Sequence, residues 1–148
     1  MVDIAVCITP KHSGTPPVDE YIEMSACVVD ANLVYDPAYR ISRRVDIKSD
    51  CSAQERTDTW GVEFAILNAW IKECVSPRAK LRIWTDVPYT FYALYAKVCA
   101  EKQIDPLFTN TSISDTSTLE LIANITLNDL VFADDDAMAM VAAIEDLA

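Results

Sequence analysis

The sequence predicts an α/β fold in which a mixed five-stranded sheet is flanked by helices. Three strand-like segments come first in the chain, and helix-like and strand-like segments alternate after them. Hydrophobic residues make up 51% of the chain and charged residues 24%, which is typical of a globular protein. A chain of 148 residues is long enough to bury one core, so we expect residues 1–148 to form a single domain.

The first part of the chain contains three expected strands. Residues 2–9 are apolar and rich in β-branched side chains, which predicts a buried strand. Residues 21–30 predict a second strand, and residues 39–47 alternate well enough to predict a third, more exposed one.

Helical spacing of apolar residues follows a polar connection. The spacing predicts a helix over residues 57–75, which Thr57 or Thr59 can cap. Pro88 stands at a favourable first-turn position of the next helix. The other elements are expected at residues 80–85 (strand), 88–103 (helix), 106–110 (short strand), 114–124 (helix) and 134–147 (helix).

Composition and charge exclude several classes of function. The net charge is -11, which argues against tight binding of nucleic acid, because such proteins neutralise phosphates with Lys and Arg. Two glycines are too few for a phosphate-binding loop or a dinucleotide fingerprint. The five cysteines include no C-x-x-C pair and are expected to be buried thiols, and the one histidine cannot support a zinc site by itself. We see no signal peptide or membrane-spanning run and expect a cytoplasmic protein with no membrane partner.

Three consecutive aspartates begin the last expected helix. Asp134 and Asp135 lie at its amino end, where the helix dipole favours acids by roughly 0.3–1 kcal/mol each. Asp136 is in line with Met140 and Ile144 at helical spacing, so we expect it to point toward the sheet.

Four segments carry a resemblance to a known family: "AVCITPKHSGTPPVDEYIEMSACVVD", "LRIWTDVPYTFYALYAKVCAEKQID", "SDTSTL" and "VFADDDAMAM". Together with the order of elements, they resemble the DEDD-type 3′-5′ exonucleases of the DEDDh branch, in particular the small phage and bacterial members. The resemblance implies a ribonuclease H-like fold, with an antiparallel meander of three strands followed by parallel strands. In that family four acidic residues hold two divalent metal ions, and a histidine activates the attacking water.

Most positions that match the motifs of this family do not carry the acidic residues and the histidine that its metal-dependent reaction needs. Cys7 and Thr9 stand where the first motif has an aspartate and a glutamate, and Val131 stands at the histidine position. The second-motif aspartate falls on Phe91, or on Thr90 if the register shifts by one. Asp115 matches the R-D-x-R-T-L segment, and Asp136 matches the aspartate of the last motif.

One remaining carboxylate cannot hold two dications, because Mg²⁺ and Mn²⁺ need several hard oxygen ligands. The resemblance therefore implies no catalytic residues, and no cofactor is expected. The alternative is an active exonuclease on single-stranded DNA or RNA, with Mg²⁺ or Mn²⁺ in a rearranged site. Asp86 could reach the mouth of such a site, whereas Asp3 is too far from Cys7. Neither Asp115 nor Glu23 is clearly within reach.

Two further groups of side chains have a structural and a functional interpretation. Tyr89, Phe91, Tyr92 and Tyr95 could stack on bases, although their helical spacing favours a core face. The acids near the carboxyl end either form a solubilising face or offer a negative surface to a basic protein. These acids are Asp129, Asp134, Asp135, Glu145 and Asp146.

Our leading hypothesis is a catalytically inactive, exonuclease-like protein that acts by binding. By analogy with the family, it is a phage or mobile-element accessory factor or inhibitor in the host cytosol, and its acidic surface engages a protein partner, in particular a basic one. Nucleic acid is not an expected partner. A structural or assembly homo-oligomer, such as a homodimer, is a third hypothesis.

Overall fold

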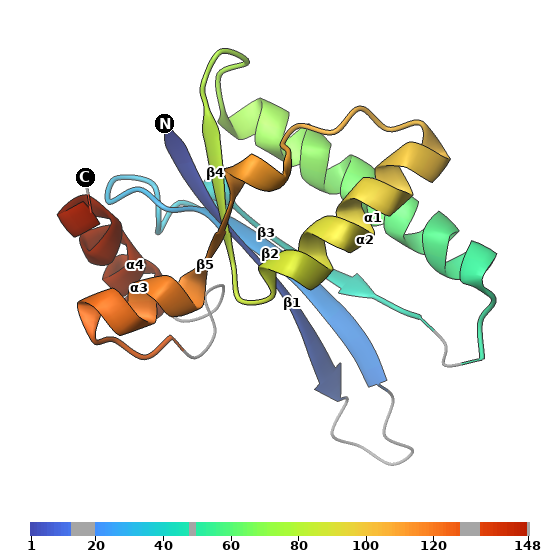
Figure 1. Ribbon diagram of the computed structural model, residues 1–148, viewed down its shortest axis with the longest axis horizontal. Helices are drawn as coiled ribbons and strands as arrows, with labels where there is room; N and C mark the ends of the chain where they lie inside the picture. Colours follow the sequence, from blue (N-terminus) through green and yellow to red (C-terminus); the bar gives the residue numbers. More distant parts are fainter. Residues whose placement is uncertain (13–19, 48–49, 128–133, 148) are drawn as a thin grey trace.

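The computed structural model describes residues 1–12, 20–47, 50–127 and 134–147 of the chain, and they contain a five-stranded mixed sheet (Figure 1). The strands are β1 (Val2–His12), β2 (Glu20–Val28), β3 (Arg40–Val45), β4 (Leu81–Thr85) and β5 (Ile113–Asp115). Their order across the sheet is β3-β2-β1-β4-β5, with β1, β2 and β3 antiparallel and with β4 and β5 parallel to β1. The predicted α/β class and its mixed five-stranded sheet are confirmed.

Helices α1 (Ala53–Cys74) and α2 (Pro88–Lys102) pack on one face of the sheet (Figure 1). Even-numbered residues of β1, such as Ile4 and Val6, enter the core on this face, because successive strand residues point to opposite sides. The ring of Phe64 from α1 lies edge-on to that of Tyr95 from α2, with centroids 5.2 Å apart. This face holds the larger of the two cores.

Helices α3 (Thr116–Ala123) and α4 (Asp134–Leu147) belong to the opposite face. The apolar residues there include Ala5 and Cys7 from β1, Trp84 from β4, and Met140 and Ile144 from α4. The sheet therefore separates a large core rich in aromatic rings from a smaller one.

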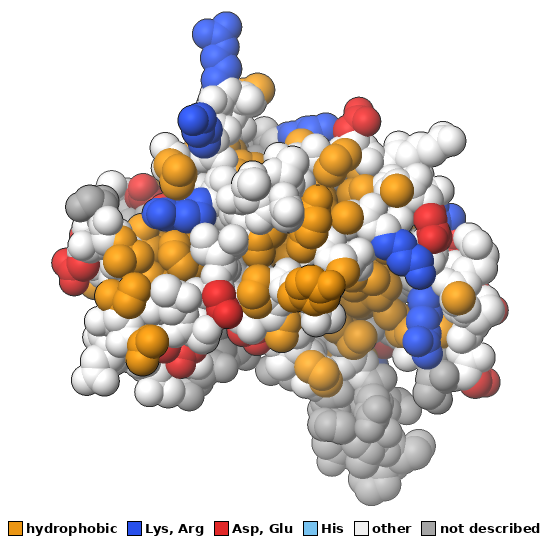
Figure 2. All heavy atoms as spheres, in the orientation of Figure 1, with side chains coloured by type: hydrophobic (Ala, Val, Ile, Leu, Met, Phe, Trp, Pro, Cys, Tyr) orange, Lys and Arg blue, Asp and Glu red, His pale blue; other side chains and the backbone are white. Residues whose placement is uncertain are grey.

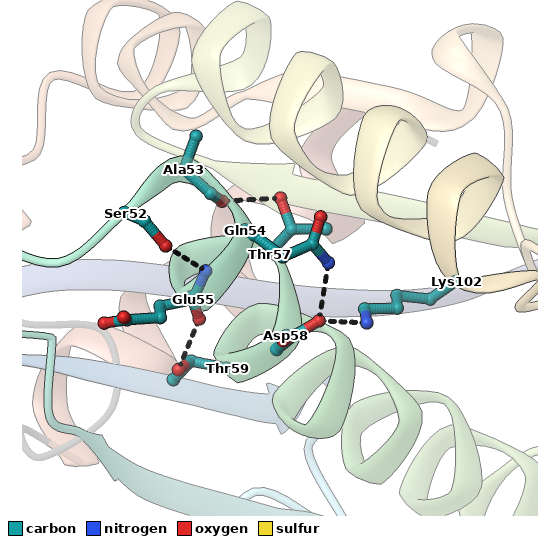
Figure 3. A network of polar contacts seen from close by, with 8 residues as sticks. All are labelled: Ser52, Ala53, Gln54, Glu55, Thr57, Asp58, Thr59 and Lys102. Atoms are coloured by element: carbon teal, nitrogen blue, oxygen red, sulfur yellow. Dashed lines mark hydrogen bonds and ion pairs between the residues drawn. The ribbon is translucent and has the colours of Figure 1, made fainter.

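The start of α1 differs from the prediction. The helix begins at Ala53, and Ser52 is its N-cap, since the Ser52 hydroxyl oxygen accepts a hydrogen bond of 3.1 Å from the backbone N–H of Glu55 (Figure 3). Thr57 and Thr59 lie inside the helix, where their hydroxyls donate to the carbonyl groups one turn earlier. The predicted cap was wrong because the polar residues before Thr57 already form the first turn.

The predicted strand at residues 106–110 was also wrong, since β5 lies at Ile113–Asp115. Phe108 is buried, as an apolar residue of a predicted strand is expected to be. Its side chain, however, enters the core from a segment that is not a strand. The backbone N–H of Leu107 donates to the hydroxyl of Tyr95 at 3.0 Å instead of to a neighbouring strand. Pro106 has no N–H to offer to a sheet.

The last two helices begin close to where the sequence predicts. Asp115 caps α3 by accepting a hydrogen bond of 2.9 Å from the backbone N–H of Ser117, and α4 runs from Asp134 to Leu147 as expected. Among the described residues, no helix combines the length and the apolar character needed to cross a membrane.

Candidate functional site

The two first-motif positions lie side by side on the β1 face that α4 covers. Cys7 and Thr9 are two residues apart on a strand and therefore share this face. The Cys7 Sγ and the Thr9 Oγ1 are 3.0 Å apart and hydrogen-bonded to each other. Cys7 is buried, whereas Thr9 is half-buried. These positions thus form a thiol–hydroxyl pair.

The surroundings of Cys7 are apolar. It belongs to the same buried cluster as Ala5, Trp84, Leu119 and Met140. Aliphatic and aromatic side chains offer no oxygen or nitrogen ligand to a hard cation, and a dication in such surroundings would lose its hydration without compensation. The residues around Cys7 therefore do not fit a pair of divalent metal ions.

Asp136 has the orientation that its spacing predicts. It lies in the first turn of α4 and is buried, as are Met140 and Ile144 farther along the same side of the helix. Its carboxylate therefore faces the interior on the side of the sheet that carries Cys7.

Phe91 lies elsewhere. Its side chain is 1% exposed in the core between α1 and α2, where its ring stacks with those of Tyr95 and Phe108 at centroid distances of 6.0 Å. The second-motif position is thus on the opposite face of the sheet from Cys7 and Thr9, and neighbouring Thr90 is exposed. The match of Phe91 to the second motif therefore does not bring this residue to the site around Cys7, because α2 turns Phe91 into the larger core.

Aromatic residues of α2 divide between core and surface. Phe91 and Tyr95 are buried, which confirms the expected core face, whereas Tyr89 is 89% exposed. Tyr92 is half-buried.

The other predicted residues are distributed over several places. Asp115 ends β5 and is used as the cap of α3. Glu145 and Asp146 are exposed near the end of α4. Asp134 and Asp135 begin α4, and nothing is described of their side chains, while Asp129 and Val131 lie outside the described residues.

Glu23, whose reach the sequence left undecided, is next to the pair. Glu23 of β2 is the register partner of Thr9, so its side chain lies on the same face. Its Oε1 accepts hydrogen bonds from the hydroxyls of Ser42 at 3.0 Å and Ser25 at 3.3 Å. The sequence left the reach of Glu23 undecided, because it depends on the hairpin register and a linear sequence gives no register. Asp86 is exposed just beyond the end of β4.

Asp3 has a structural role at the beginning of β1. Its Oδ1 accepts hydrogen bonds from Arg82 Nε and from Trp84 Nε1, both on β4, and Arg82 also forms an ion pair with it. This carboxylate joins two adjacent parallel strands and does not replace Cys7, as the distance along the strand predicts.

The thiol of Cys27 also belongs to the apolar cluster. Burial raises the pKa of the Cys27 thiol to about 11, so it stays protonated at neutral pH and is a poor nucleophile. Within the described parts of the chain, no group of three or more His, Cys, Asp and Glu residues is arranged to hold a metal ion.

A cavity of about 270 Å³ opens at the other end of β1. Its walls include Val2 and Asp3 at the start of β1, Asp30 after β2, and Ile144 and Glu145 of α4. It therefore lies apart from Thr9, which is near the carboxyl end of the strand.

No protein-family model matches the chain, and no curated protein is significantly similar to it.

Proposed function

We propose that this chain is a catalytically inactive, exonuclease-like protein that acts by binding a protein partner. The observation that carries the proposal is the hydrogen-bonded pair of buried Cys7 and half-buried Thr9, at positions where the resembling family has an aspartate and a glutamate. A two-metal mechanism needs carboxylates at these places to hold the ions that stabilise the attacking and leaving oxygens.

Strand order supports the ribonuclease H-like part of the proposal. An antiparallel β1–β2–β3 meander is followed by β4 and β5, which run parallel to β1. Fold alone does not carry function, so the argument for inactivity depends on the residues at the site.

Charge supports the binding part of the proposal. After Lys102 the chain contains nine Asp and Glu residues and no Lys, Arg or His. The residues up to Lys102 contain 14 acidic and 12 basic residues, so nearly all of the net charge of -11 belongs to the segment that forms β5, α3 and α4. A segment whose charged residues are all acidic attracts basic proteins and repels nucleic acid. A phage or mobile-element accessory factor or inhibitor, acting in the host cytosol, is the role that we propose for it.

A nuclease assay tests the first half of this proposal. Labelled single-stranded DNA and RNA are incubated with the full chain in Mg²⁺ or Mn²⁺, alongside Asp136→Asn and Glu23→Gln variants. We expect no degradation by any of the three proteins. Metal-dependent degradation that Asp136→Asn abolishes would establish an active exonuclease and overturn the proposal.

Affinity capture from host lysate tests the second half. The full chain should retain a basic protein at moderate salt, and a Glu145→Gln/Asp146→Asn variant should retain less of it. Glu73→Gln/Glu101→Gln is the matched control, since it removes two negative charges from exposed residues near the ends of α1 and α2, outside the acidic segment. A stable homo-oligomer in light scattering with no retained partner would favour the structural hypothesis instead.

A further inference from the structure

Helix α3 carries large apolar side chains on its solvent side. Leu121 is 84% exposed and Ile122 is 59% exposed, whereas Thr116 and Leu119 of the same helix are buried. One side of this short helix therefore packs on the protein, and the other side presents two adjacent aliphatic side chains to solvent. Figure 2 shows hydrophobic and acidic side chains together on the part of the surface over α3 and α4.

Leu121 and Ile122 belong to the part of the chain after Lys102, in which every charged residue is acidic. Glu120 precedes Leu121 and is half-buried, while Glu145 and Asp146 are exposed on α4, which packs against α3. No Lys or Arg occurs between Lys102 and the end of the chain. We call Glu120, Leu121 and Ile122, together with Glu145 and Asp146, the α3–α4 surface.

The charge decides between two possible occupants of this surface. A second copy of the chain would bring two purely acidic segments together, and like charges at an interface oppose association. A partner with Lys and Arg around an apolar stripe would pair with the acids and bury Leu121 and Ile122 in the same contact. Exposed apolar groups of this kind typically mark interaction sites when they lie together rather than singly.

We propose that the α3–α4 surface binds a basic amphipathic helix of a partner protein. Apolar residues spaced three and four apart on that helix cover Leu121 and Ile122, and its flanking Lys and Arg residues face Glu120, Glu145 and Asp146. The inference rests on the proposed binding function and names the class of partner.

A synthetic peptide supplies the probe for a direct test. The peptide has about 18 residues, with Leu on one helical face and Lys on the other, and its binding to the full chain is followed by fluorescence anisotropy. A peptide of the same composition with Leu scattered around the helix measures purely electrostatic attraction. We expect the amphipathic peptide to bind at least about tenfold more tightly than the scattered one. Equal affinity of the two peptides would overturn the proposal.

Variants of the chain locate the contact. Leu121→Ser/Ile122→Ser should weaken binding of the amphipathic peptide by about tenfold or more, because the apolar anchors are lost. Val62→Ser on α1 is the matched control, since Val62 is 59% exposed, as Ile122 is, and it should leave binding unchanged. Unchanged binding in the double variant would contradict the proposal.

NMR keeps the test independent of whether the double variant folds. With the unmodified chain, amide shifts caused by the amphipathic peptide should centre on α3 and the end of α4, and shifts centred elsewhere would overturn the assignment.

The dependence of binding on salt distinguishes a basic partner helix from a second copy of the chain. Peptide binding should weaken when salt is raised, because the charge attraction is screened within a Debye length of about 10 Å at 0.1 M. Self-association through the same surface would strengthen, since its repulsion is screened. Dimerisation that grows with salt and disappears in Leu121→Ser/Ile122→Ser would therefore contradict the proposal. Nuclease activity, in contrast, would refute the proposed function and leave the peptide result standing.

Discussion

At the scale of single residues, polar side chains inside this protein are matched by specific partners. Asp3 joins β1 to β4 through Arg82 and Trp84, and Arg43 on β3 pairs with the buried Glu63 on α1 at 2.9 Å. The Cys7 thiol and the Thr9 hydroxyl are likewise hydrogen-bonded to each other, at 3.0 Å. A buried polar atom that loses its partner costs more than the bond itself contributes.

The hydroxyl of Tyr95 is the clearest example of a buried polar group with specific hydrogen-bond partners. This hydroxyl donates to Asn68 Oδ1 at 2.8 Å and accepts from the backbone N–H of Leu107 at 3.0 Å, and burial raises its pKa, so the proton stays in place. We predict that Tyr95→Phe lowers the free energy of unfolding by about 1–3 kcal/mol, because two partners are left without it. Urea unfolding measures this loss. Tyr89→Phe, on an exposed residue, should change nothing, and equal effects of the two variants would contradict the assignment.

Asp58 gives a prediction about pH. Hydrogen bonds from Lys102 and Gln54 hold the pKa of this carboxyl below its ordinary value (Figure 3). A depressed pKa in the folded state contributes stability that is fully present above the unfolded pKa of about 3.9 and is lost as pH falls through the folded value. In Lys102→Gln the pKa of Asp58 should rise, as a carboxyl-detected NMR titration would show. An unchanged pKa would contradict the pairing.

At the scale of secondary structure, elements with strong local signals could be predicted and those set by tertiary contacts could not. Pro88 indicates the start of α2, and the helical spacing after three aspartates indicates α4. Phe108 is apolar like a strand residue, yet its segment is fixed by the Tyr95 hydroxyl. The pairing of Glu23 with Thr9 depends on a register that only the folded hairpin defines. The candidate site was therefore predictable on β1 and α4, where spacing decides, but not on β2 or α2.

The cap of α1 can be tested by mutation. Ser52→Ala should lower the free energy of unfolding by about 1 kcal/mol, because the backbone N–H of Glu55 loses its acceptor. Thr59→Ala should have a smaller effect, since Thr59 lies inside the helix, where its hydroxyl only adds a bond to the Glu55 carbonyl. Thermal or urea unfolding compares the two, and a larger loss in Thr59→Ala would restore the cap that the sequence suggested.

Phe91 tests the assignment of α2 to the core. We predict that Phe91→Ala lowers the free energy of unfolding by about 3–5 kcal/mol, because it removes a ring packed against Phe64, Tyr95 and Phe108. A loss below about 1 kcal/mol in urea unfolding would mean that Phe91 is not a core residue.

At the scale of the whole molecule, the larger core and most of the negative charge belong to different parts of the chain. The sheet and helices α1 and α2 contain the large core and nearly balanced charges, whereas β5, α3 and α4 are made from a segment with acidic charges alone. The site that resembles a nuclease centre lies where the two parts meet, and its β1 residues are a thiol and a hydroxyl. This division is what a protein that keeps a nuclease-like framework for binding would require.

Titration of the full chain with Mn²⁺ by isothermal calorimetry tests the central claim most directly. The account predicts only the heat of dilution, both for the natural sequence and for Asp136→Asn, because the Cys7–Thr9 pair supplies neither of the two carboxylates that the resembling family has at these positions. Saturable binding of Mn²⁺ that is lost in Asp136→Asn would contradict it.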